Sequence, residues 1–182
     1  MKVLLLFISL LTFLPSNGQE SFMNISVHQD IRLLLFGDGQ SNGSFTPDLL
    51  VRFEIEAFKL EKSSFVFYIG AEYSDLNSAS FQRFLIGIGY VTEFSFLKKF
   101  NFGAYIDHGI ILRGKSSFIG EVKIDESSFM GLSMNFETTY PVSNKIRLSL
   151  LYQAIDRKDL TTRFDSNHNI KGSIFLGAKF AL

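Results

Sequence analysis

Apolar and polar residues alternate one by one along most of the chain. Between residues 48 and 58, for example, Leu49, Val51 and Phe53 alternate with Arg52 and Glu54. A period of two places successive side chains on opposite faces of a β-strand. The pattern recurs in eight segments, namely 24–36, 48–58, 64–74, 81–92, 100–113, 128–140, 145–155 and 170–182. It predicts eight strands, each with an apolar and a polar face and each close to the roughly 9–11 residues of a tilted membrane-spanning strand.

The connections between these segments alternate in length. Three are mostly short: 59–63, 93–99 and 141–144. Four are mostly longer and rich in Gly, Ser, Asn and Asp: 37–47, 75–80, 114–127 and 156–169. Bacterial barrels have short periplasmic turns and longer extracellular loops, and an even strand count leaves both termini in the periplasm. The sequence therefore predicts an all-β fold, a single closed antiparallel up-and-down barrel. Apolar residues within 114–127 also predict a hairpin extension there.

The first residues have the features of a cleaved signal peptide. Lys2 precedes an apolar run, which is followed by Pro15 and by small residues at Ser16 and Gly18. The apolar run is shorter than the about 20 residues of a spanning helix, and no later segment has that length. We expect a signal peptide over 1–18, a barrel domain over 19–182, and a location in the outer membrane.

Composition supports a membrane barrel more than a nucleic-acid-binding protein. The 18 Lys and Arg residues balance the 18 Asp and Glu residues, so no net positive charge favours nucleic acid. The chain has 21 Phe, 6 Tyr and no Cys, so its stability depends on backbone pairing and packing without disulfides. Aromatic residues near the segment ends fit the girdle of a membrane barrel. They are Phe65, Tyr73, Tyr90, Phe100, Phe102, Tyr140 and Tyr152.

The polar faces carry charges of both signs. If these faces point inward, an eight-stranded barrel is just wide enough for side chains to fill it. Unpaired charges there would cost several kcal/mol, so we predict an internal ion-pair network and no continuous channel. Its expected members are Arg32, Arg52, Arg83, Arg113, Arg147, Asp30, Glu54, Glu56, Glu72, Asp107 and Glu137. The same alternation also fits a soluble lipocalin-like barrel that carries a lipid in an apolar lumen.

Candidate chemistry is sparse. The three histidines, His28, His108 and His168, stand in no metal-binding spacing, so we assign no metal, cofactor or catalytic residue. The segment 37–44 has Asp and Asn oxygens but lacks the spacing and closing Glu of a known calcium loop. We interpret it as a polar surface loop.

One loop carries several basic residues. Arg157, Lys158 and Arg163 within 156–165 suit lipopolysaccharide phosphates, although acidic neighbours weaken the local field.

Two segments resemble a known group of proteins. The closing segment 172–182 and the turn-flanked segment 140–146 are similar to those of the small outer-membrane β-barrels of Gram-negative bacteria. The resemblance implies contact with outer-membrane lipid, lipopolysaccharide and the barrel-assembly machinery, and a monomer. Together with the lack of a site, it leads us to expect a non-enzymatic barrel with an envelope-structural or surface-interaction role. The alternative from this group is a lipid A-modifying enzyme that uses a Ser and a His near the outer leaflet.

Overall fold

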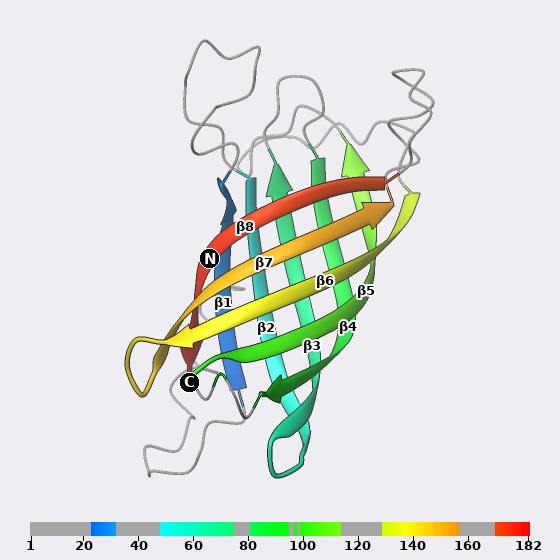
Figure 1. The fold of residues 1–182 in the computed structure, drawn as a ribbon. Coiled ribbons are helices and arrows are strands. Elements are labelled where there is room, and N and C mark those ends of the chain that lie inside the picture. The colour runs from blue at the N-terminus through cyan, green and yellow to red at the C-terminus, as the bar shows by residue number, and fades with distance from the viewer. Residues whose placement is uncertain are drawn as a thin grey trace, which may run out of the picture.

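The computed structural model describes residues 23–31, 48–74, 81–94, 97, 99–113, 129–156 and 170–182. These residues form one closed antiparallel barrel in which every strand pairs with its neighbours in chain order, as Figure 1 shows. The strands are β1 (Met23–Asp30), β2 (Asp48–Lys59), β3 (Ser63–Ser74), β4 (Phe81–Glu93), β5 (Asn101–Arg113), β6 (Phe129–Pro141), β7 (Ile146–Asp156) and β8 (Ile170–Ala181). The predicted fold class is confirmed. No helix among the described residues is long and apolar enough to cross a membrane.

The predicted strand bounds agree with the structure to within one residue, except at the end of the first strand. That strand was predicted to continue to Phe36, but β1 ends at Asp30. The reason is the register: β2 begins at Asp48, so the pairing of β1 with β2 stops at Gln29 and Leu49. Residues 32–36 lie outside the described residues, as do the signal peptide over 1–18 and the hairpin extension over 114–127.

The barrel closes between its first and last strands. β1 pairs with β8 in a ladder that places Ser26 opposite Lys179, and the Leu182 amide donates to the Met23 carbonyl at 3.0 Å. β1 therefore begins and β8 ends at the same end of the barrel, where the turns β2–β3 and β6–β7 also lie (Figure 1). We call this the turn end. The segments that connect strands at the opposite end lie outside the described residues.

The two faces of the wall have opposite character. Outward-pointing Phe67 and Ile86 are 55% and 67% exposed, whereas inward-pointing Ser26, Arg83 and Gln153 are fully buried. The apolar face thus points outward and the polar face inward. This corrects the lipocalin-like alternative, because the lumen is not apolar.

A β-bulge in β2 interrupts this alternation before Phe58. The register of β2 against β3 shifts between Glu56 and Phe58, so Phe58 lies opposite outward-facing Phe65. In an unbroken strand Phe58 would point inward with Glu54 and Glu56. The bulge instead leaves Phe58 exposed on the apolar surface.

The interior is filled by large side chains packed against glycines. Tyr68 and Tyr105 lie edge to face with ring centroids 5.6 Å apart. A Cβ atom at Gly87 would overlap the Tyr68 ring, and one at Gly89 or Gly103 would overlap the Tyr105 ring. Glycine on the inward faces of β4 and β5 therefore provides the space for both rings, consistent with a packed core at this strand number.

Candidate functional site

Arg52 lies near the centre of the lumen. Its Nη2 atom is 2.7 Å from Glu137 Oε2 and 3.2 Å from Glu54 Oε1. Its guanidinium carbon is 4.7 Å from the Tyr105 ring centroid and 5.5 Å from that of Tyr68. Cation–π contact and charge-assisted hydrogen bonds therefore both compensate the buried charge.

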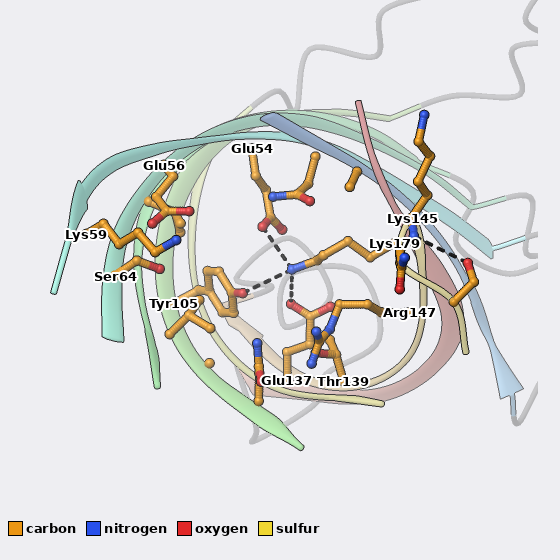
Figure 2. Close-up of a pocket in the computed structure, with 18 residues that line it drawn as sticks. Glu54, Glu56, Lys59, Ser64, Tyr105, Glu137, Thr139, Lys145, Arg147 and Lys179 are labelled. Atoms are coloured by element: carbon orange, nitrogen blue, oxygen red, sulfur yellow. Dashed lines mark hydrogen bonds and ion pairs between the residues drawn. The ribbon is translucent and has the colours of Figure 1, made fainter. Parts of the chain in front are cut away.

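Lys179 from β8 enters the same cluster. Its Nζ donates to Glu54 Oε2 at 2.9 Å, to Glu137 Oε2 at 3.0 Å and to the Tyr105 hydroxyl at 3.4 Å, as Figure 2 shows. Two cations, Arg52 and Lys179, thus share two carboxylates. The alternation placed Lys179 on the polar face of its strand, but its partners depend on how the barrel closes.

A second cluster surrounds Arg83. The Arg83 guanidinium pairs with Asp107 and lies 3.4 Å from Glu72 Oε2. Asp107 also accepts hydrogen bonds from the Tyr68 hydroxyl at 2.8 Å and from the Asn135 amide at 2.7 Å. The two clusters fill the lumen with hydrogen-bonded side chains, which compensates their loss of hydration.

The predicted ion-pair network is confirmed for six of its members, namely Arg52, Arg83, Glu54, Glu72, Asp107 and Glu137. Two other members behave differently. Arg147 donates from Nε to Thr139 Oγ1 at 2.9 Å, and Glu56 has no ion-pair partner among the described residues. Asp30, the remaining described member, is fully buried on the inward face of β1. Arg32 and the side chain of Arg113 lie outside what the structure describes.

A serine and a histidine meet inside the lumen. His28 Nε2 lies 2.9 Å from Ser149 Oγ, and Ser149 donates to Glu137 Oε1 at 2.5 Å. In a hydrolytic triad the acid binds the other ring nitrogen, yet His28 Nδ1 has no hydrogen-bond partner among the described residues, and Glu137 lies 3.4 Å from Nε2. All three side chains are buried and belong to the charge cluster around Arg52. The contact between His28 and Ser149 therefore lies inside the lumen and does not face the outer surface.

The other candidate residues are separate from this cluster. His108 is exposed on the outward face of β5, between Ile86 of β4 and Leu132 of β6. His168, the segment 37–44, and Arg157, Lys158 and Arg163 lie outside the described residues. Within the described part of the chain, no group of three His, Cys, Asp or Glu side chains is placed to hold a metal ion.

A cavity of about 370 Å³ occupies the lumen at the turn end, and Figure 2 shows the residues around it. Lys179, Glu54 and Glu137 form its inner part, while Lys145 comes from the β6–β7 turn. Its remaining charged residues are Glu56, Lys59 and Arg147. The sequence pattern gave no sign of this cavity, because its volume depends on how far each inward side chain reaches.

No family model matches this sequence, and no curated protein sequence matches it either. Solved structures do match. The Yersinia pestis outer membrane protein Ail in a phospholipid bilayer nanodisc aligns with a TM-score of 0.55 and 13% identity, over 88% of this chain and 99% of that one. The crystal structure of Ail from Yersinia pestis aligns with a TM-score of 0.48 and 14% identity, over 88% of this chain and 97% of that one. The crystal structure of Neisserial surface protein A aligns with a TM-score of 0.49 and 12% identity, over 91% of this chain and 100% of that one. The chain therefore has the closed eight-stranded fold of the small outer-membrane β-barrels, as its sequence pattern predicted.

Proposed function

We propose that the protein is a non-enzymatic integral barrel of the outer membrane, with a side-chain-filled lumen and extracellular loops that serve an envelope-structural or surface-interaction role. The observation that carries this proposal is the outward apolar face, which runs around the whole closed wall. Exposed large apolar residues lie on every strand, among them Val27, Ile55, Phe67, Ile86, Ile106, Met134, Leu148 and Leu176. A surface of this extent in water would be an aggregation liability, whereas lipid acyl chains cover it without cost.

The height of the wall suits a bilayer. β2 to β8 have 11 to 13 residues each. At about 3.3 Å per residue and a tilt of about 40°, such strands rise roughly 30 Å, which covers the apolar band of a membrane barrel.

Aromatic residues gather at the turn end, where a membrane interface would lie. Phe65 and Tyr90 have ring centroids 5.1 Å apart, and Phe100 and Tyr140 have centroids 5.2 Å apart. Phe65, Tyr90 and Tyr140 are partly exposed on the outer face. Aromatic rings at this height favour anchoring at the lipid headgroups.

The filled lumen supports a structural role over that of a pore. Arg52 and Arg83, each paired with carboxylates, occupy the cross-section at two levels. The lipid A enzyme is not favoured, because His28 and Ser149 are buried and His108 has Ile86 and Leu132 beside it on the outer face.

The first test is the mobility of the expressed full chain on an SDS gel, with and without boiling of the membrane fraction. A closed barrel has no free edge from which to unravel, so we expect SDS resistance, a shift on heating and an outer-membrane location. In a planar bilayer the refolded protein is expected to show no steady conductance. Recovery of the protein in the soluble fraction would overturn the membrane proposal.

The absence of Cys in the sequence provides a clean test of orientation. A single cysteine at Ser41→Cys, in a long connection, is expected to react with a membrane-impermeant maleimide on intact cells. The matched variant Ser143→Cys, in the short β6–β7 turn, is expected to react only after the cells are broken. The reverse result would place the termini outside and refute the proposed orientation.

A further inference from the structure

The cavity at the turn end contains charged side chains that form no direct ion pair with another described residue. On its inner side, Lys179 is already paired with Glu54 and Glu137. Closer to the turns, Arg147 and Glu56 line the cavity without an ion-pair partner among the described residues. These two groups differ in this respect from Arg52 and Arg83 deeper in the lumen, which are paired with carboxylates.

Arg147 is held in a defined orientation. Its Nε donates to Thr139 Oγ1 at 2.9 Å, and the neighbouring strands β6 and β7 fix both residues. The two terminal nitrogens of the guanidinium have no hydrogen-bond acceptor among the described residues. A guanidinium edge of this kind matches the two oxygens of a carboxylate. Lys145 on the same wall adds a second positive charge.

Glu56 stands on the other side of the cavity, on β2, as Figure 2 shows. Glu56 and Arg147 therefore place a negative and a positive group in one cavity, which Lys59 also lines beside Glu56. Asn24, Asn101 and Asn144 also line the cavity and supply neutral groups that can bond to amides. The volume of about 370 Å³ is at the lower end of the range of small-molecule sites.

We propose that this cavity binds a free amino acid or short zwitterionic peptide, with its carboxylate on Arg147 and its ammonium group near Glu56. The binding itself depends only on the folded barrel. That the ligand comes from the periplasm rests on the proposed function, which places the turn end on that side of the membrane.

The test titrates the refolded full chain in detergent micelles with alanyl-alanine, followed by NMR chemical shifts. We expect saturable binding at millimolar concentrations. The C-terminal amide of the dipeptide lacks the carboxylate, and its N-acetyl derivative lacks the ammonium group. Each is expected to bind about tenfold more weakly or worse, because a charge-assisted hydrogen bond is lost.

Protein variants test the same two subsites. Arg147→Gln is expected to weaken the dipeptide about tenfold and to abolish the preference for the free acid over the amide. Glu56→Gln is expected to abolish the preference for the free amine over the N-acetyl form. Lys99→Gln and Glu61→Gln are matched controls, since both residues are exposed outside this cavity, and they should bind like the unchanged protein.

The outcomes separate this inference from the proposed function. No binding, or equal binding of the dipeptide and both derivatives, would overturn the inference even if the barrel shifts on heating and inserts into membranes. Binding with the expected preferences by a protein that fails to insert would support the site and refute the membrane proposal. The heat shift of each variant on a gel shows that it is folded, and the ligand derivatives need no variant at all.

Discussion

Glu137 is the carboxylate on which the central cluster depends most. It binds Arg52 at 2.7 Å and Lys179 at 3.0 Å, accepts from Ser149 at 2.5 Å, and is 2% exposed. The variant Glu137→Gln keeps the shape of the side chain and an oxygen that accepts from Ser149. It removes the negative charge and leaves Arg52 and Lys179 with Glu54 alone.

The expected loss follows from this imbalance. Two cations and two carboxylates become two cations and one carboxylate in a buried site. Removing one partner of a buried ion pair costs about 3–5 kcal/mol, mainly because a charge is left uncompensated. We expect Glu137→Gln to lower the free energy of unfolding by about that amount.

A double variant distinguishes charge balance from lost contacts. Glu137→Gln combined with Lys179→Gln leaves Arg52 with Glu54, which lie 3.2 Å apart, and restores neutrality. The loss in the double variant should therefore be smaller than the sum of the two single losses by about 2 kcal/mol or more. Glu93→Gln, an exposed position at the turn end of β4, is the control and should change little.

The assay is urea unfolding in lipid vesicles, followed by far-ultraviolet circular dichroism and by the mobility of unboiled samples on a gel. The chain contains no Trp, so tryptophan fluorescence is not available as a probe. A loss below about 1 kcal/mol for Glu137→Gln, or strict additivity of the two substitutions, would refute the reasoning from buried charge balance.

Three further substitutions test the packing and the two faces of the wall. Gly89→Ala is expected to lower the free energy of unfolding by about 1–3 kcal/mol, since the added Cβ overlaps the Tyr105 ring, and unchanged denaturation would contradict this. His108→Leu should raise the stability in vesicles by about 1–2 kcal/mol, because the outward ring has no hydrogen-bond partner among the described residues; a decrease would indicate a polar contact in the membrane. Ile86→Lys places a charge on the outer face and should cost about 2–4 kcal/mol in vesicles, whereas a neutral effect would argue against lipid contact there.

The sequence determined the strands and their two faces, because an alternation of period two is a local property of a strand. The segment 81–92 shows this well: the pattern placed Phe84, Ile86 and Ile88 on one face, and all three are exposed on the outer wall. The pattern also predicted a charged interior around Arg52 and Arg83. The alternation could not show which face pointed outward, since a soluble barrel has the same period.

Two contacts required the tertiary structure. Lys179 pairs with Glu54, which is far from it in the sequence, because β8 closes the barrel against β1. His28 of β1 and Ser149 of β7 meet over Gly177 of β8, which is the register partner of both residues.

The alternating pattern also did not predict the β-bulge, the end of β1 or the cavity in the lumen. The bulge at Glu56 reverses the direction of Phe58, and the end of β1 is set by where β2 begins. The free guanidinium of Arg147 beside an open cavity depends on the reach of every side chain around it. An alternating pattern gives the direction of each side chain, whereas closure of the barrel decides which of them meet.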